Sequence, residues 1–534
     1  MNKAIASLVL SVGILLFSCA EKKSSGTEVA AENKQVTTVA TYQNPVIPGD
    51  FADPSIIRVG DLYYAVGTSS EWAPYFPIFK SNDLINWKQT GYVFQEKPEW
   101  TSSSFWAPEL YYHNNTYYVY YVARRKSDGV SVIGVATSKN PEEGFTDHGV
   151  LIEHDKEAID PFVTNDNGQL YISWKAYGLD PRPIELLGSK LSADGLKLEG
   201  EPFFMLKDDN LRGIEGQYLM KKDGFYYLFY SEGACCGGGC DYDVRVARAK
   251  SIKGPYELHE KNPILKENSE WKCPGHGTIV ETPAGKHFYM YHAYSQHDDI
   301  YTGRQALLDE VFWDKSTGWP YFANEGTPSA TASLSANNIT QETTYDISDD
   351  FEAEKRSLFW QWDFRNSQPE ILLEDGNLCL SGATEANNNA GTALTVRPYL
   401  GTYEIITEVV ASSPSLKGLV LYGDVSQAVG IGVENEEVQL WEVKDNKRKV
   451  LAKSNVASAT PVQLKMTVED GSKITFFWSQ DDNTWTEIKE AEGTFYDGSF
   501  LPQWDRSPRP GLIHHGKTTE PACFSFFELT YGEN

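Results

Sequence analysis

Five stretches of the sequence each begin with a polar residue that precedes an apolar run, a tight turn and a second, aromatic run. The leading residues are Asp53, Glu109, Asp160, Glu215 and His276. Carboxyl groups that are brought together cannot all ionise at their ordinary pKa values, so one can stay ionised as a base while another stays protonated as an acid. Two such groups facing each other across a pocket with aromatic walls can hydrolyse a glycosidic bond. Metal binding or capping of a channel is the alternative that the repeat leaves open.

The same stretches predict β-hairpins. Their turns read VGD, HNN, NDNG, KKDG and TPAG, which are typical connections between alternating strands. Two more strand-like runs follow each hairpin, which gives four strands per unit at a period of roughly 50–60 residues, as in β-propeller blades. The sequence therefore predicts an all-β fold that begins with a five-bladed propeller over residues 41–325.

The propeller also predicts where the leading residues lie. The inner strands of a propeller surround a central channel, so equivalent residues of the five blades converge at one mouth of it. Pro54 and Pro161 each follow an acid at the start of a strand. A missing N–H is tolerated there, and the fixed φ of proline restrains the chain. We therefore expect the five leading residues at one opening of the channel.

The C-terminal part of the chain predicts a second β domain. Residues 326–340, GTPSATASLSANNIT, are small and polar and predict a linker. Residues 341–534 contain short alternating runs separated by turns, without helical periodicity. This pattern favours a β-sandwich.

The N-terminus predicts export from the cytoplasm. Residues 1–19 contain Lys3, an apolar core and a final Cys19, which resembles a bacterial lipoprotein signal. Residues 20–40 carry almost no large apolar side chains and predict a flexible tether. We therefore expect a lipoprotein in the periplasm or at the outer-membrane or cell surface, which contacts the membrane only through lipid on Cys19.

Charge and cysteine content narrow the partners and the chemistry further. A net charge of −27 at pH 7 disfavours nucleic acid and anionic membrane as partners. Three of the six cysteines that follow Cys19 lie in ACCGGGC, at Cys235, Cys236 and Cys240. Their spacing fits no common zinc pattern, so a disulfide-stiffened loop is favoured over a metal cluster. The loop could border the pocket, and a disulfide between the adjacent cysteines is one of several open connectivities.

The motifs as a set resemble glycoside hydrolase family 43, and the resemblance covers nearly all of the chain from residue 43 onward. One set falls in each blade; among them are FADPSIIRVGDLYYAVGTS, FWAPEL, AIDPFV, GIEGQYLMKKDGFYYL and GRQALL. The resemblance implies a five-bladed propeller and inversion at the anomeric carbon. It implies that Asp53 is the general base, that Glu215 is the general acid, and that Asp160 orients Glu215 and raises its pKa. Inverting enzymes hold the base and the acid about 6.5–9.5 Å apart, which leaves room for a water.

The resemblance suggests further site residues. His276 in PGHGT matches a channel histidine that often faces a bound calcium ion through waters, although a hydrogen-bonded histidine is the alternative. Arg304 in GRQ matches a substrate-binding arginine aimed at a sugar hydroxyl or at Asp160, with a blade-edge salt bridge as the alternative. Trp72 and Trp106 are candidate pocket walls, with core packing as the competing explanation.

The C-terminal stretch resembles the concanavalin-like jelly roll of β-xylosidases in this family, with FWQWDF and GNLCL as the closest matches. Its late loop, SFLPQWDRSPRPGLIHHG, departs from the usual version. The domain could bind carbohydrate, support the propeller or cover the pocket.

The whole resemblance implies an exo-acting glycosidase that removes xylose or arabinofuranose from plant polysaccharides or oligosaccharides. A β-galactofuranosidase or galactanase is the alternative on the same fold. A non-catalytic glycan-binding lipoprotein is the alternative from another class, and the presence of all three acids argues against it.

Overall fold

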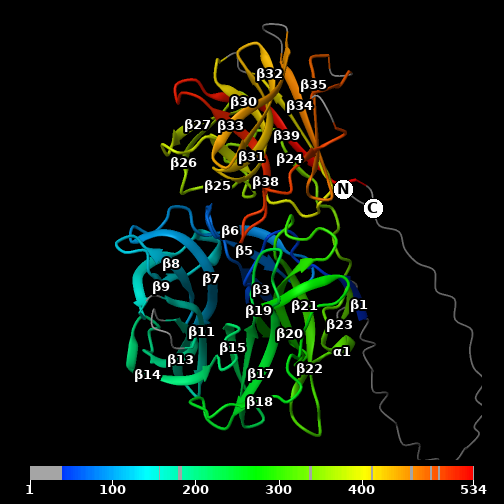
Figure 1. The fold of residues 1–534 in the computed structure, drawn as a ribbon. Helices are drawn as coiled ribbons and strands as arrows, with labels where there is room; N and C mark the ends of the chain where they lie inside the picture. Colours follow the sequence, from blue (N-terminus) through cyan, green and yellow to red (C-terminus); the bar gives the residue numbers. More distant parts are fainter. Residues whose placement is uncertain are drawn as a thin grey trace, which may run out of the picture.

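The computed structural model describes residues 39–532 except 156, 178–182, 336–338, 411–412, 457–460, 482–483 and 491–492. The predicted signal and nearly all of the predicted tether lie outside the described residues. The chain forms two β domains that are stacked on each other, the N-terminal one below and the C-terminal one above in Figure 1. Among the described residues, no helix has the length and hydrophobicity needed to cross a membrane.

The N-terminal domain is a propeller of five four-stranded antiparallel blades. Blade 1 contains β2 (Ser55–Val59), β3 (Leu62–Val66), β5 (Tyr75–Ser81) and β6 (Lys88–Phe94). Blade 2 contains β7 (Thr101–His113), β8 (Thr116–Arg125), β9 (Ser131–Ser138) and β10 (Thr146–Ile152), with the short 3-10 helix η1 (Pro141–Glu143) before its last strand. Blade 3 contains β11 (Glu157–Asp166), β12 (Gln169–Tyr177), β13 (Glu185–Leu191) and β14 (Leu198–Lys207). Blade 4 contains β15 (Ile214–Lys222), β16 (Phe225–Glu232), β17 (Asp243–Ala249) and β18 (Glu257–Leu258). Blade 5 contains β19 (Trp271–Glu281), β20 (His287–Ser295), β21 (Gln305–Trp313) and β22 (Pro320–Phe322).

The first strands of the five blades close a ring. Each one contacts the first strand of the next blade, and β19 of blade 5 contacts β2 of blade 1. Aromatic side chains fill the space between blades; Phe76 of blade 1, for example, packs against Phe105 and Tyr121 of blade 2. The predicted five-bladed propeller is therefore confirmed.

The hairpin turns within the blades have the expected backbone. Asn114 and Asn115 both have positive φ, of 49° and 55°, and so do Asp223 and Gly224, at 49° and 77°. Two successive residues with positive φ form the hairpin turn whose twist matches that of the flanking strands, and Asn, Asp and Gly adopt this conformation most readily.

The two ends of the propeller sequence pair with each other. β1 (Val39–Gln43) and β23 (Thr331–Ser335) form a two-stranded antiparallel sheet, which follows the short α1 (Ala323–Gly326). β23 lies in the stretch that the sequence predicts to be a linker. Its small polar residues conceal the strand in the sequence, because its one large apolar side chain is the buried Leu334.

The C-terminal domain is a sandwich of two antiparallel sheets around one apolar core, as predicted. The first sheet contains β24 (Ile347–Asp349), β26 (Ser367–Glu374), β27 (Asn377–Thr384), β29 (Tyr403–Val409), β34 (Val462–Glu469), β35 (Lys473–Ser479), β36 (Thr486–Glu487), β37 (Tyr496–Asp497) and β39 (Ala522–Thr530). The second contains β28 (Thr392–Thr395), β30 (Leu416–Asp424), β31 (Gln427–Glu434), β32 (Glu437–Lys444), β33 (Lys447–Asn455) and β38 (Arg509–His515). A strand pair between β25 (Trp362–Asp363) and β4 (Trp72–Ala73) joins the sandwich to blade 1.

Candidate active site

One bulged residue marks the start of the inner strand in every blade. Asp53, Ala107, Asp160, Gly216 and His276 all have positive φ, between 38° and 60°. In each blade this residue lies two positions before a regular pair with the second strand, and in blades 2 to 5 the register shifts there. A bulge of this kind bends the strand and aims its side chain out of the sheet. It therefore places five backbone positions at the channel mouth, four of which carry a side chain, since the fifth is Gly216.

This register corrects two of the five predicted leading residues. The position equivalent to Asp53 is Ala107 in blade 2, two residues before Glu109, and Gly216 in blade 4, one residue after Glu215. Alternation along a strand reverses at a bulge, so a sequence pattern cannot tell which of two neighbouring residues faces the channel.

Glu109 lies inside the channel and does not line the pocket. It is 5% exposed and accepts a hydrogen bond from the Ser55 hydroxyl at 2.7 Å. Burial outweighs this hydrogen bond and that from the Val163 amide, and raises the pKa of Glu109 to about 8. Glu109 is therefore protonated at neutral pH and joins the inner strands of three blades.

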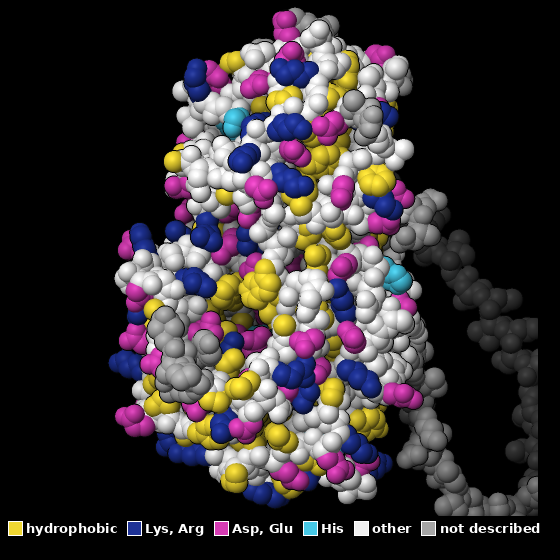
Figure 2. Space-filling view, in the orientation of Figure 1, with side chains coloured by type: hydrophobic (Ala, Val, Ile, Leu, Met, Phe, Trp, Pro, Cys, Tyr) yellow, Lys and Arg dark blue, Asp and Glu magenta, His cyan; other side chains and the backbone are white. Residues whose placement is uncertain are grey.

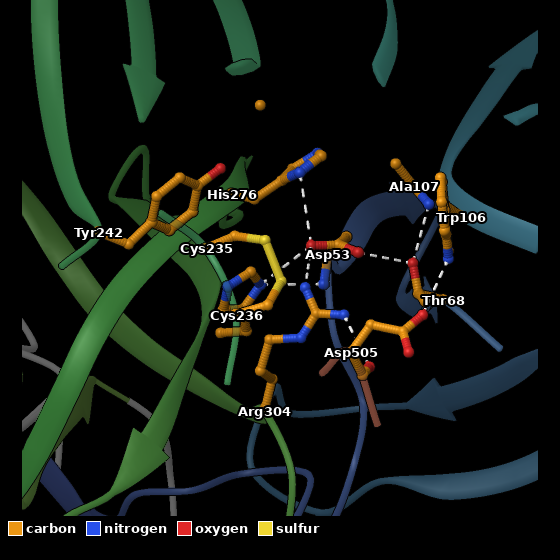
Figure 3. A network of polar contacts seen from close by, with 12 residues as sticks. Asp53, Thr68, Trp106, Ala107, Cys235, Cys236, Tyr242, His276, Arg304 and Asp505 are labelled. Carbon is orange, nitrogen blue, oxygen red and sulfur yellow. Dashed lines mark hydrogen bonds and ion pairs between the residues drawn. A yellow bond between two sulfur atoms is a disulfide. The ribbon is translucent and has the colours of Figure 1, made fainter. Parts of the chain in front are cut away.

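Asp53 is surrounded by groups that stabilise its charge. Arg304 Nη1 donates to its Oδ1 at 3.1 Å, and Thr68 Oγ1 donates to its Oδ2 at 2.7 Å. The amide of Ala107 donates to the same Thr68 hydroxyl at 2.8 Å, which links the bulges of blades 1 and 2 (Figure 3). Burial opposes ionisation, but Arg304, His276 and the buried His292 outweigh it and hold the pKa of Asp53 well below its usual range. Asp53 is therefore a carboxylate at neutral pH.

Asp160 and Glu215 lie close together and line the same pocket as Asp53. Asp160 Oδ2 accepts a hydrogen bond at 2.9 Å from the amide of Gly216, the residue next to Glu215. Tyr242 donates its hydroxyl proton to Glu215 Oε1 at 3.0 Å, and Lys175 Nζ donates to Oε2 at 2.8 Å. The structure thus brings Asp53, Asp160 and Glu215 to one pocket, as predicted.

Lys175 changes the expected electrostatics of this pair. Burial, together with the negative charges of Glu215 and Asp53, raises the pKa of Asp160 to about 6. Burial also opposes ionisation of Glu215, but Lys175 outweighs it and lowers the pKa of Glu215. The resemblance implies the opposite direction for Glu215. In the ligand-free pocket, the raised pKa of Asp160 and the lowered pKa of Glu215 mean that Asp160 binds a proton more readily than Glu215 does.

Lys175 is not among the site residues predicted from the sequence. It stands on β12 in SWKAY, where its neighbours Trp174 and Ala176 are buried. A charged residue between two buried apolar residues of a strand is seldom buried without a partner. That pattern was the signal that could have identified it.

Lys175→Met should shift the pH dependence of activity. A general acid is active only when protonated, so activity falls as the pH rises through its pKa. Removing the cation raises the pKa of Glu215, and the alkaline limb of kcat/KM should move up by roughly 1–3 pH units. Lys175→Arg keeps the charge and serves as the control. The alkaline limb of its kcat/KM profile should lie near that of the wild type. An unmoved limb in Lys175→Met would show that Lys175 does not tune Glu215.

His276 lies between two of the carboxylates. Its Nδ1 is 3.5 Å from Asp53 Oδ1 and 3.8 Å from Asp160 Oδ2. Within the described residues, no group of three or more His, Cys, Asp or Glu side chains is placed to hold a metal ion. Calcium prefers six to eight oxygen ligands, which these side chains do not supply. Calcium in the channel stays a prediction, and no step proposed below uses it.

Arg304 and Trp106 line the pocket, as predicted, but Arg304 has a different partner. Its guanidinium binds Asp53, whereas the predicted partners are a sugar hydroxyl or Asp160. Its Nη2 also donates to the backbone oxygen of Asp505 at 3.3 Å, and Trp106 Nε1 donates to Asp505 Oδ2 at 3.3 Å. Asp505 belongs to the late loop of the sandwich. That loop is therefore fastened to the propeller at the edge of the pocket.

Trp72 does not line the pocket, so its prediction as a wall is wrong. It is 1% exposed and packs with Tyr422 and other side chains of the sandwich. The guanidinium of Arg509 lies 4.2 Å from its ring. Trp72 is instead part of the contact between the two domains, because β4 extends blade 1 towards the sandwich.

The pocket is a cavity of about 370 Å³ at the channel mouth, a size suited to a small ligand. Both domains contribute to it: the propeller supplies the three acids and the sandwich supplies Trp504 and Asp505. Figure 2 shows hydrophobic and acidic side chains around a hollow at the waist between the domains. Of the three roles open to the sandwich, the structure therefore shows it as a wall of the pocket. A separate cavity in the sandwich, near Glu442 and Tyr496, contains none of the predicted site residues.

The comparisons with known proteins agree with this architecture. The sequence model of Glycosyl hydrolases family 43 matches residues 42–320, and that of the Beta xylosidase C-terminal Concanavalin A-like domain matches residues 348–506. A Xylan 1,3-beta-xylosidase from Vibrio sp is 31% identical over 320 residues, which are 54% of this chain and 58% of that enzyme. The Extracellular exo-alpha-(1->5)-L-arabinofuranosidase ArbA from Cellvibrio japonicus is 31% identical over 311 residues, which are 51% of this chain and 86% of that enzyme.

A solved structure matches both domains. The GH43 BlXynB protein from Bacillus licheniformis has a TM-score of 0.79 and 26% sequence identity, and the match covers 92% of this chain and 99% of that chain. The propeller and the sandwich are thus found together in a relative of known structure.

A five-bladed propeller whose channel mouth holds an ionised carboxylate opposite a carboxyl pair defines an acid–base hydrolase of sugars. The family match extends over the propeller, and the domain match over most of the sandwich. The chain belongs to glycosyl hydrolase family 43.

Proposed function

We propose that the protein is an exo-acting, inverting glycosidase that removes xylose or arabinofuranose from the non-reducing ends of plant polysaccharides or oligosaccharides. The observation that carries the proposal is the pocket in which ionised Asp53 faces the pair of Asp160 and Glu215. The relatives named above, a xylosidase and an arabinofuranosidase, support the substrate class. A pocket that the sandwich closes on one side favours release of terminal residues.

The three acids have distinct roles in the proposed reaction. Asp53 takes a proton from a water, whose oxygen attacks the anomeric carbon. Glu215 gives its proton to the glycosidic oxygen as the bond from carbon to that oxygen breaks, and the product has the inverted configuration. Asp160 holds the proton that passes to Glu215. Its hydrogen bond from the Gly216 amide also fixes the position of the neighbouring Glu215. Entry of substrate between Lys175 and Glu215 would weaken their ion pair and favour transfer of this proton to Glu215.

The test is a panel of p-nitrophenyl glycosides, followed by NMR of the first sugar released. We expect cleavage of the β-D-xylopyranoside or the α-L-arabinofuranoside, with inversion at the anomeric carbon. Preference for the β-D-galactofuranoside would favour the alternative activity on this fold. Binding of the sugars without turnover would favour a glycan-binding protein.

We also propose that the protein is a lipoprotein anchored outside the cytoplasm through Cys19. The support is the signal-like sequence of residues 1–19, and the Cellvibrio relative is described as extracellular. Cys19→Ala should move the protein from the membrane to the soluble fraction and leave kcat unchanged. Equal membrane binding by both forms would contradict the anchor.

A further inference from the structure

The ACCGGGC loop forms part of the pocket wall. The loop connects β16 to β17, and it contains a disulfide between the adjacent residues Cys235 and Cys236. Both cysteines line the pocket together with Asp53 and Arg304. In Figure 3 the disulfide lies on one side of Asp53 and Trp106 lies on the other. The proposed reaction gives this disulfide no role.

Several contacts hold this wall in place. A second disulfide, Cys240–Cys273, ties the loop to β19 three residues before His276. The amide of Gly237 donates to the Tyr294 hydroxyl at 3.1 Å, and the amide of Ala234 donates to Asp241 Oδ1 at 2.7 Å. The loop is thus fixed on both sides of the Cys235–Cys236 bond.

The wall continues into the sandwich. A side chain at Gly237, which has a φ of +75°, would come within about 3.5 Å of Trp504. The late loop of the sandwich therefore lies within van der Waals reach of Gly237. Trp504 is 62% exposed and also lines the pocket. The disulfide and the indole ring are thus neighbouring apolar parts of the pocket lining that also contains the charged groups.

The chemistry of this surface matches one part of a sugar. A sugar ring has hydroxyl groups on its rim and C–H groups on its faces. The hydroxyl groups need donors and acceptors, which Asp53, Arg304 and Lys175 supply, whereas the C–H faces need apolar contact. Disulfide sulfur is polarisable and a weak hydrogen-bond acceptor, so it packs well against C–H groups. Linking the two sulfurs also prevents each side chain from rotating alone.

We propose that the Cys235–Cys236 disulfide is a substrate-contacting wall that packs against a C–H face of the bound pentose. The inference rests on the proposed function. If the wall contacts the sugar, the affinity for the sugar depends on whether this disulfide is intact. A dithiol that reduces the disulfide leaves two separate thiols on the protein and is itself oxidised to a disulfide.

The first experiment is Cys235→Ser/Cys236→Ser, which removes the bond and leaves Cys240–Cys273 to hold the loop. Loss of a contact made equally in the ground and transition states raises KM without changing kcat. We expect a KM about tenfold higher, with kcat within about a factor of two and an unchanged melting temperature. The matched control is Cys379→Ser/Cys523→Ser, which removes the disulfide between β27 and β39 of the sandwich and should keep the wild-type KM.

The second experiment treats both enzymes with dithiothreitol. The KM of the wild type should rise towards that of the Cys235→Ser/Cys236→Ser variant, and the variant should not respond further. A variant with the wild-type KM would overturn the inference. An equal rise in both enzymes would also overturn it, because the effect would then come from Cys240–Cys273.

Binding measurements separate this inference from the proposed function. If the wild type cleaves no pentoside, the proposed function fails, but calorimetry with D-xylose and L-arabinose still tests the wall. Weaker binding of these sugars by the variant than by the wild type supports the wall. Equal binding overturns it.

Discussion

Asp53→Asn should lower kcat by about 10²–10⁴-fold on natural oligosaccharides and on aryl glycosides alike. Both substrates need an activated water, and an amide cannot accept its proton. Asn keeps the size of Asp53 and an acceptor for the Thr68 hydroxyl. The measurement is kcat on a xylo- or arabino-oligosaccharide and on the corresponding p-nitrophenyl glycoside.

Glu109→Gln is a matched control for this variant. Glu109 is also a buried acid of an inner strand, but it lies outside the pocket and its raised pKa of about 8 keeps it neutral at pH 7. Replacing a protonated carboxyl by an amide of the same shape should leave kcat within about a factor of two, since no catalytic group changes. If Asp53→Asn kept wild-type activity, the base would have to be another group.

Glu215→Gln should distinguish substrates by their leaving groups. Sugar alcohols are poor leaving groups and need a proton, so cleavage of natural xylosides or arabinosides should fall by about 10²–10⁴-fold. A nitrophenolate leaves with little assistance, so aryl glycosides should lose much less. The measurement is the loss of activity on the natural glycoside divided by the loss on the aryl glycoside. If this ratio were the same for Glu215→Gln as for Asp53→Asn, Glu215 would not be the acid.

The pH profile of the same variant gives a second readout. In the wild type, activity should fall as the pH rises above about 6, because the proton shared by Asp160 and Glu215 is lost there. On an aryl glycoside, Glu215→Gln should lose this alkaline limb, since its amide does not titrate. A limb that persisted unchanged would assign it to another group.

The sequence by itself determined the repeating architecture and the three acids. Hairpin turns and alternating runs are local signals, so each blade can be identified without the others. Acid–proline pairs at Asp53 and Asp160 mark the starts of two inner strands for the same reason. The repeat also names Glu215 as a leading residue, one position before the bulged Gly216, and the resemblance of the motifs assigns it the role of general acid.

Tertiary structure decided which side chains reach the pocket. The bulge in each inner strand turns Ala107 towards the mouth and leaves Glu109 in the channel, a choice that alternation cannot make. Lys175 meets Glu215 only because neighbouring blades pack side by side. Trp72, a predicted wall of the pocket, is covered by the sandwich, and Trp504, for which the sequence makes no prediction, is carried to the pocket by the sandwich. Such contacts join residues from 40 positions apart, as in Lys175 and Glu215, to several hundred. They depend on how whole blades and domains pack, which no local pattern in the sequence records.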